Sequence, residues 1–161
     1  MSTISLPSEL TSALPSGYGI RRLQKTDKAD FLAVLSVLTT VGDIPDPAWN
    51  DRFEYIAKNE DTYTILCITD EAGQVCATGS LIVERKFIRN CGLVGHIEDI
   101  AVAKDKQGKR LGLRMIQALD HIAEQAGCYK SILDCSESNK GFYEKCGFKF
   151  AGVEMAHYYS K

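Results

Sequence analysis

A long helical stripe between two strand-like segments constrains the fold more than any other feature of this sequence. Residues 95–102 and 129–135 are strand-like runs, and the segment between them is long enough for a helix. Gly127 is suited to end that helix. Apolar side chains recur in it at helical spacing, namely Leu111, Met115, Leu119, Ile122 and Ala126. A strand, a crossover helix and a second strand predict a parallel pair inside a sheet.

The segments on either side of this unit predict the rest of the sheet and its covering helices. Runs at 62–69 and 75–84 flank the turn at 70–73 and predict an antiparallel hairpin. All four prolines precede residue 48, so none interrupts the later strands. The other predicted elements are a strand at 18–23, a helix from Thr26 or Asp27 to about Leu38, a helix from Asp46 to about Lys58, a short helix capped by Ser138 and ended by Gly147, and a strand at 148–155. This order predicts an α+β fold, a mixed and mostly antiparallel sheet with helices on both faces.

The length of the chain indicates how many domains it forms, and its net charge limits the classes of partner. A chain of 161 residues suits one domain, and we expect it at 18–161 after a loosely ordered leader at 1–17. A net charge of −2 and a pI of about 5.9 argue against nucleic acid or an anionic membrane surface as the main partner. No apolar run approaches the ~20 residues that span a bilayer, so we expect no membrane partner. The cytoplasm is the expected location, with organellar targeting left open.

The cysteines and histidines do not predict a metal or disulfide framework. The six cysteines are widely spread and include no C-x-x-C pair, so we expect free thiols in a reducing compartment. No two of the three histidines have metal-ligand spacing with a carboxylate or a thiol. We therefore predict no metal.

The six residues before the long helix, QGKRLG at 107–112, combine two glycines with two cations. Exposed backbone N–H groups and positive charge at a helix start suit an anion, most simply a phosphate. Two nucleotide patterns do not match. The P-loop pattern needs a glycine and a hydroxyl where this chain has Ala103 and Arg110, and the dinucleotide pattern G-x-G-x-x-G is absent.

A third pattern fits better. The loop resembles the pyrophosphate-binding loop of the GNAT superfamily of N-acetyltransferases, with Arg110 in place of that pattern's first glycine. "GHIEDIAV" and "NKGFYEKCGF" are similar to the central strand and a later helix of the same superfamily. Together with "LTTVG", "ERK", "CYK", "LDC" and "GVEM", they resemble the glucosamine 6-phosphate N-acetyltransferases from about Tyr18 to Met155.

The resemblance implies acetyl-CoA as the co-substrate. Lys109 and Arg110 would add charge to the pyrophosphate loop, and Asn139 would contact the cofactor. The backbone of the central strand would stop pairing near a bulge and bind the pantetheine arm, with the Ile100 N–H as oxyanion donor. The implied cofactor-binding residues are Ile100, Ala101, Val102, Gly108, Lys109, Arg110, Leu111, Gly112, Leu113, Asn139 and Tyr143.

The resemblance also implies the catalytic residues Tyr143, Asp134 and Asp99. The Tyr143 hydroxyl would lie beside the thioester sulfur and serve the departing thiolate; otherwise Tyr143 is a core aromatic. Asp134 would bind the amine or the sugar hydroxyls and help take the proton, or else cap the following helix. Glu98 and Asp99 are adjacent in a strand and should point to opposite faces, so at most one side chain faces the substrate.

The sugar phosphate requires cations and hydroxyls. By the resemblance, Lys86 and Arg89 bind the phosphate, with Arg89 in place of the family's histidine. Tyr129 and Lys130 would approach the phosphate across the interface of a homodimer. The implied substrate-binding residues are Thr39, Lys86, Arg89, Glu98, Asp99, Tyr129, Lys130 and Asp134. Tyr158 stands where the family often has an arginine.

The function implied is transfer of an acetyl group from acetyl-CoA to D-glucosamine 6-phosphate, in the synthesis of UDP-N-acetylglucosamine. Two alternatives remain open. The same fold could acetylate another small amine or a protein N-terminus, or the chain could be a non-catalytic acyl-CoA-binding sensor. A phosphate-binding cluster favours the phosphosugar, and a retained Tyr143 favours an enzyme.

Overall fold

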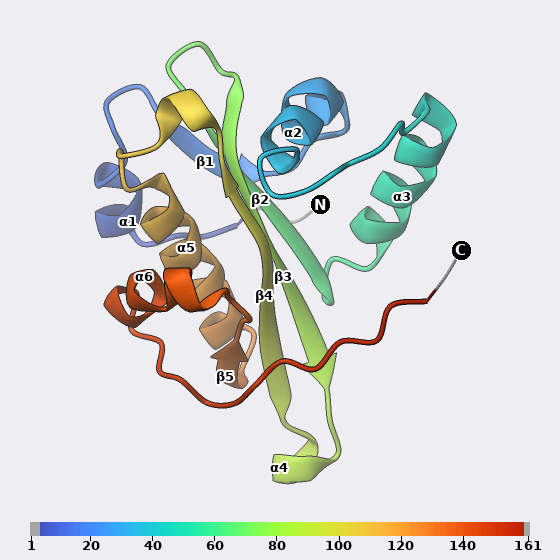
Figure 1. The fold of residues 1–161 in the computed structure, drawn as a ribbon, viewed down its shortest axis with the longest axis vertical. Helices are drawn as coiled ribbons and strands as arrows, with labels where there is room; N and C mark the ends of the chain where they lie inside the picture. Colours follow the sequence, from blue (N-terminus) through green and yellow to red (C-terminus); the bar gives the residue numbers. More distant parts are fainter. Residues whose placement is uncertain (1–3, 160–161) are drawn as a thin grey trace.

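The computed structural model describes residues 4–159, which form a mixed five-stranded sheet in the order β1-β2-β3-β4-β5 (Figure 1). The strands are β1 (Gly19–Arg22), β2 (Tyr63–Thr69), β3 (Val75–Arg85), β4 (Leu93–Val102) and β5 (Cys128–Ile132). The first four are antiparallel to their neighbours, and β4 and β5 run parallel. The predicted mixed sheet with a parallel pair is therefore confirmed.

Helices cover both faces of the sheet (Figure 1). On one face, α5 (Leu111–Gln125) makes the crossover between β4 and β5, with α1 (Ser8–Ser12) and α6 (Lys140–Lys145) beside it. On the other face lie α2 (Lys28–Leu35) and α3 (Asp46–Lys58). The short helix α4 (Ile88–Cys91) caps the far end of the β3–β4 hairpin. Single 3₁₀ turns are η1 (Lys25–Asp27), η2 (Lys104–Lys106) and η3 (Glu137–Asn139).

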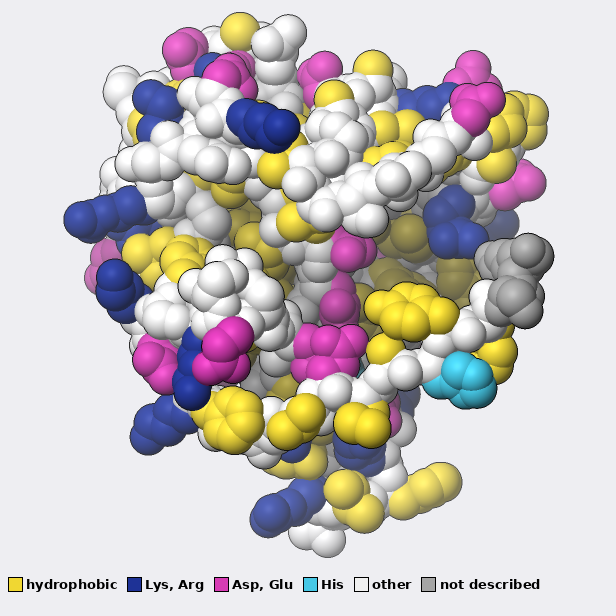
Figure 2. All heavy atoms as spheres, in the orientation of Figure 1, with side chains coloured by type: hydrophobic (Ala, Val, Ile, Leu, Met, Phe, Trp, Pro, Cys, Tyr) yellow, Lys and Arg dark blue, Asp and Glu magenta, His cyan; other side chains and the backbone are white. Residues whose placement is uncertain are grey.

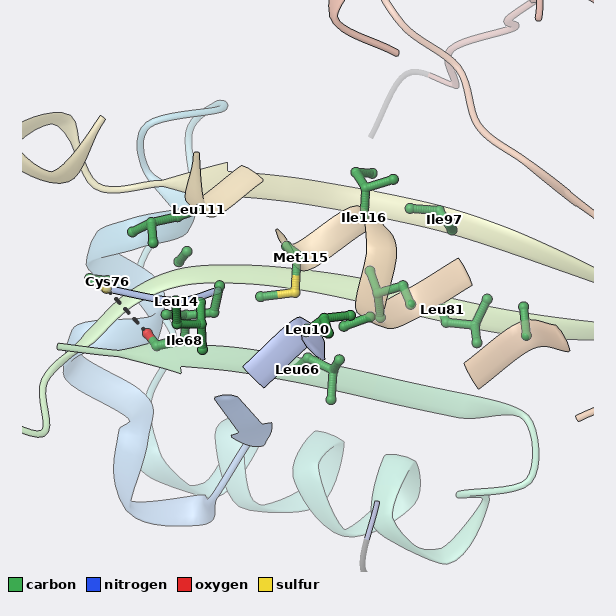
Figure 3. Packing of buried hydrophobic residues seen from close by; sticks show 14 of the residues in the cluster. Leu10, Leu14, Leu66, Ile68, Cys76, Leu81, Ile97, Leu111, Met115 and Ile116 are labelled. Carbon is green, nitrogen blue, oxygen red and sulfur yellow. Dashed lines mark hydrogen bonds between the residues drawn. The ribbon is translucent and has the colours of Figure 1, made fainter. Parts of the chain in front are cut away.

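The apolar stripe of α5 packs directly on β2 and β3 (Figure 3). The residues at this contact are fully buried, including Leu66, Ile68, Leu81, Met115 and Leu119. A second cluster, which includes Phe31 and Trp49, lies between the sheet and the helices α2 and α3. The predicted helix after residue 26 ends at Leu35, earlier than expected, and Leu38 is exposed.

Of the predicted leader at 1–17, residues 1–3 lie outside the described residues, and the remainder includes one short helix. Ser8–Ser12 form α1, and Leu10 and Leu14 are each only 8% exposed. These two leucines are one helical turn apart and join the cluster around α5. The apolar residues before Gly17 are few and lie among prolines and polar residues, so their periodicity is too short to predict a helix.

The predicted last strand is wrong. Residues 147–159 contain no helix or strand and run as an extended tail from α6 across β4 and β3 (Figure 1). Its large apolar side chains are exposed, among them Phe150, Val153 and Met155. A strand needs a neighbouring strand to accept its backbone hydrogen bonds, and no strand of the described residues pairs with this tail. Alternating apolar residues alone therefore did not make a strand.

Gly79 on β3 marks the tightest contact between the sheet and α5. A Cβ at this position would lie 2.5 Å from Ile100 Cδ1, 2.8 Å from Met115 Cγ and 2.9 Å from Leu119 Cδ1. We expect Gly79→Ala to lower the free energy of unfolding by about 1–3 kcal/mol, because overpacking a filled core strains its side chains. Urea denaturation measures this change. Gly141→Ala is the matched control, since a Cβ there meets nothing within 4 Å; equal loss in both variants would contradict close packing at Gly79.

Candidate active site

The loop at 107–112 turns into α5 through two left-handed residues. Gly108 has a φ of +84°, and Arg110, the residue before the helix, has φ 60° and ψ 21°. Glycine adopts this conformation without strain, which explains why the superfamily pattern has glycine where this chain has Arg110. No side chain caps the helix start at Arg110. The first N–H groups of α5 therefore remain available to an anion.

The small size of Gly112 lets α6 approach this loop. A Cβ on Gly112 would lie 3.4 Å from Phe142 Cζ and 3.8 Å from Val102 Cγ2. Asn139 and Tyr143 belong to η3 and α6, so the same contact brings these two predicted site residues next to the helix start. The loop, the end of β4 and α6 therefore lie next to one another.

A β-bulge interrupts β4 at Asp99. Thr78 pairs with Ala101 and Ser80 with Glu98, so Asp99 and Ile100 together oppose Gly79. Asp99 has a φ of 52°. The bulge interrupts the regular alternation at this point, and both Glu98 and Asp99 are exposed, so their placement on opposite faces stays a prediction.

Shortly before the bulge, β4 separates from β5. Their parallel pairing covers only Leu93–His96 of β4 and ends where β5 ends, at Ile132. On this side of β4, the stretch 97–102 has no strand partner within residues 4–159. The stretch includes Ile100, Ala101 and Val102, whose backbone groups on that side can pair with an extended ligand.

Tyr143 is half-buried on α6 and packs against the cluster around α5. Its ring contacts Phe142 edge to face, with 5.0 Å between the ring centroids. Burial raises the pKa of the Tyr143 hydroxyl, and the nearby thiols of Cys135 and Cys146 add to the shift. The phenol is therefore held neutral, as a hydrogen-bond donor with a fixed ring.

Four carboxylates gather beside the bulge and are called the acidic group here: Glu98, Asp99, Asp134 and Glu154. Partial desolvation of the Glu98 carboxylate raises its pKa, and the negative charges of the other three raise it further. Acidic side chains gather at the centre of the face shown in Figure 2. Asp134 follows β5 and is exposed, and the N-cap position of η3 is Ser136. The alternative reading of Asp134 as that helix cap is therefore not supported.

Cations and aromatic rings gather at a second place, the end of the β3–β4 hairpin. The Arg89 guanidinium lies 5.8 Å from the centroid of the Tyr129 ring, and Lys130 Nζ lies 5.8 Å from the same centroid. Lys86 Nζ donates to Glu84 Oε1 at 2.7 Å, and Glu84 Oε2 is 2.7 Å from His96 Nε2. We call Lys86, Arg89, Tyr129 and Lys130 the hairpin cluster.

Within one chain, the backbone of the hairpin cluster lies far from the acidic group, but the Lys86 side chain reaches back toward it. Lys86 is six residues, or ~20 Å, along β3 from Ser80, the partner of Glu98. Its ammonium group donates to Glu84, which also contacts His96, two residues from Glu98. Thr39 is exposed in the loop after α2, on the opposite half of the molecule from α4 (Figure 1). Thr39 and the Arg89 end of the hairpin cluster therefore stand apart from the acidic group within one chain, whereas the Lys86 side chain extends toward it.

Sequence reasoning assigned no role to Glu154 and Glu84. Glu154 lies in the tail, in the "GVEM" segment, and reaches the acidic group only through the path of the tail across β4. Glu84 follows the pattern of an exposed strand residue, and its pairing with Lys86 and His96 is visible only in three dimensions. Neither residue had a local sequence signal.

Residues 4–159 contain no group of three or more His, Cys, Asp or Glu side chains that could hold a metal ion. None of the helices in that range is long and apolar enough to cross a membrane.

Comparison with known proteins gives the family. Residues 29–148 match the acetyltransferase (GNAT) family. The glucosamine 6-phosphate N-acetyltransferase of Candida albicans is 49% identical over 143 residues, which cover 88% of this chain and 96% of that protein. The crystal structure of glucosamine-6-phosphate N-acetyltransferase from Arabidopsis thaliana is 42% identical and superposes with a TM-score of 0.86, covering 89% of this chain and 99% of that one.

A more distant structure shares only the fold. An aminoglycoside N-acetyltransferase in complex with CoA is 19% identical and has a TM-score of 0.68. The two nearer relatives match over 96% and 99% of their own length. The chain therefore belongs to the acetyltransferase (GNAT) family and, within it, to the glucosamine 6-phosphate N-acetyltransferases.

Proposed function

We propose that this chain transfers the acetyl group of acetyl-CoA to the amine of D-glucosamine 6-phosphate, giving N-acetyl-D-glucosamine 6-phosphate and CoA. The strongest support for this proposal is the 49% identity to a glucosamine 6-phosphate N-acetyltransferase over 96% of that protein's length. The geometry fits the same reaction, because an anion-binding helix start, a free strand edge, a buried phenol and an acidic group meet in one region.

The co-substrate fits along the free edge of β4. The uncapped N–H groups of Gly108 to Leu113 suit the pyrophosphate, and a Cβ on Gly108 would meet nothing within 4 Å, so the backbone is open to a ligand. Lys109 and Arg110 are exposed and add positive charge. The backbone of 100–102 would pair with the pantetheine arm, which directs the thioester towards α6.

The reaction then needs three groups around the thioester. The neutral amine attacks the carbonyl carbon, a C–N bond forms, and the Ile100 N–H donates to the developing oxyanion. The amine proton passes to a carboxylate of the acidic group, directly or through water, and the raised pKa of Glu98 suits this role. The C–S bond breaks, and the Tyr143 hydroxyl donates to the departing thiolate.

We also propose a homodimer that completes the substrate site. Arg89 and Lys130 lie at the far end of the β3–β4 hairpin from the acidic group, and in this proposal a second copy supplies these cations to the sugar phosphate. Beside the cluster, Phe87 is 95% exposed and Ile88 63% exposed, and both suit burial against another chain. Sedimentation equilibrium measures the expected dimer, and a monomer with full activity would contradict this arrangement.

An amine panel tests the proposed activity against its alternatives. Release of CoA thiol from acetyl-CoA is measured with D-glucosamine 6-phosphate, D-glucosamine and a peptide with a free N-terminus. We expect fast release with the phosphosugar only. Fast release with the peptide or with unphosphorylated glucosamine would support acetylation of another amine, and binding of acetyl-CoA without any thiol release would support the sensor.

Gly108→Val tests the pyrophosphate loop. The left-handed conformation of Gly108 strains a β-branched residue and places its side chain where the phosphate should approach. We expect the Kd for CoA to rise at least tenfold, about 1.4 kcal/mol, measured by calorimetry. The matched control is Gly127→Val, since Gly127 has a φ of +86° with equally open surroundings at the other end of α5. Unchanged affinity in a folded Gly108→Val protein would rule out this loop as the pyrophosphate site.

A further inference from the structure

Lys106 differs from the other cations near the loop. Lys104, Lys109 and Arg110 are exposed, whereas the Lys106 side chain is 20% exposed. Its Nζ donates to Asp70 Oδ2 at 2.8 Å and lies 6.0 Å from the centroid of the Tyr18 ring. Lys106 therefore points its charge into the protein, at the turn between β2 and β3.

Asp70 is the buried partner of the Lys106 ammonium group. Its side chain is only 5% exposed, and its Oδ1 accepts the backbone N–H groups of Ala72 at 3.0 Å and Gln74 at 3.1 Å. The hydrogen bond from Lys106 is the main cause of the lowered pKa of Asp70. One oxygen of Asp70 thus holds the β2–β3 turn, and the other holds Lys106.

The chain between β4 and α5 has few other attachments. The Ala103 N–H donates to the Cys76 carbonyl at 2.8 Å, and the Lys106 N–H donates to the Ala103 carbonyl at 2.9 Å. After Lys106 come Gln107 and Gly108, and α5 begins at Leu111. Lys106 is therefore the last side chain fixed by a buried partner before the pyrophosphate loop.

We propose that Asp70 and Lys106 form an anchor that positions the pyrophosphate loop, so that Lys106 is a positioning residue and not a phosphate ligand. The anchor joins the start of the loop to the β2–β3 turn and so fixes where the helix-start N–H groups lie relative to the β4 edge. This inference rests on the proposed binding of CoA at the loop.

Asp70→Asn separates an anchor from a phosphate ligand. The substitution keeps the shape and keeps Oδ1 as acceptor for the turn, but it replaces Oδ2 with a donor that cannot accept from Lys106. If Lys106 is a positioning residue, Asp70→Asn and Lys106→Met should each raise the Kd for CoA about tenfold. The double variant should be no weaker than either single variant, because each change breaks the same contact. If Lys106 instead binds phosphate, Asp70→Asn frees it and CoA binds as well as before or more tightly, which would overturn the proposal.

Steady-state kinetics and a rescue variant exclude a general loss of folding. We expect a raised KM for acetyl-CoA with kcat kept at saturation, and Lys106→Arg should restore most of the affinity because it can still donate to Asp70. Asp61→Asn is the matched control, since it breaks an exposed pair with Arg85 of the same 2.8 Å length far from the loop. A lowered melting temperature with unchanged Kd in Asp70→Asn and Lys106→Met would show a merely structural pair and overturn the proposal.

Gly108→Val distinguishes failure of the anchor from failure of the loop assignment. If Gly108→Val weakens CoA binding while Asp70→Asn and Lys106→Met do not, only the anchor is wrong. If all three leave the Kd unchanged, the loop does not bind CoA and the proposal falls with it.

Discussion

Replacing Tyr143 by phenylalanine is expected to lower kcat about 10²-fold, within the range for a positioned acid. The change removes one oxygen and keeps the ring, which packs beside Phe142 and the cluster around α5. Since burial raises the pKa of Tyr143, the hydroxyl keeps its proton at neutral pH and can donate it to the leaving thiolate. Fold and stability should therefore change little.

The pattern of the kinetic constants identifies the role of Tyr143. KM for both substrates should stay nearly constant, because the stabilised charge exists mainly in the transition state. A raised KM with full kcat would instead indicate substrate anchoring, and no change in either constant would remove Tyr143 from the mechanism. Tyr55→Phe is the control, because Tyr55 is 56% exposed on α3, on the other face of the sheet.

The regular elements of this fold could be predicted because their sequence patterns agree with the final packing. The stripe from Leu111 to Ala126 became α5, and the predicted helix from Asp46 to Lys58 has the same bounds in the structure. The hairpin at 62–84 and the parallel pair also formed as expected. Each of these elements buries its apolar side chains against the sheet or within it. The apolar periodicity of the sequence therefore matches the burial in the structure.

The parts that could not be predicted depend on contacts between distant segments. The tail from residue 147 has an alternating pattern, but a strand also requires a partner edge, which the sequence of the tail does not encode. The bulge at Asp99 depends on the pairing of β3 with β4, and only the family resemblance, not the local pattern, predicted it. The Asp70–Lys106 contact joins residues 36 positions apart and has no local pattern.

The candidate site was likewise only partly predictable from the sequence. The resemblance supplied Tyr143, Asp134 and the loop residues, and the structure brings the loop, the β4 edge and α6 together. It could not supply the distance between the acidic group and the hairpin cluster, which depends on the length of β3 and β4. That distance leads to the last prediction, because it separates two halves of one substrate site.

Replacing Lys86 and Arg89 together by alanine is expected to lower kcat/KM for D-glucosamine 6-phosphate by about 10²–10³-fold, mainly through KM. Each residue can make a charge-assisted hydrogen bond to the phosphate, worth about 1.5–3 kcal/mol. Activity with unphosphorylated D-glucosamine should change little. If KM for the phosphosugar stays unaltered, the phosphate assignment is wrong. The control pair is Lys58→Ala with Arg52→Ala on α3, which removes the same charge away from the hairpin end.

Mixing this double variant with Tyr143→Phe tests whether the two halves come from different chains. In a mixed dimer, one site combines an intact Tyr143 from one copy with an intact hairpin cluster from the other. Random pairing in co-expressed protein gives about half mixed dimers with one working site each, so activity should return to about a quarter of the wild-type level. A site built from a single copy gains nothing from mixing, because every chain then carries its own defect. Activity that stays at the sum of the two parent variants would therefore show that each chain holds its own complete site.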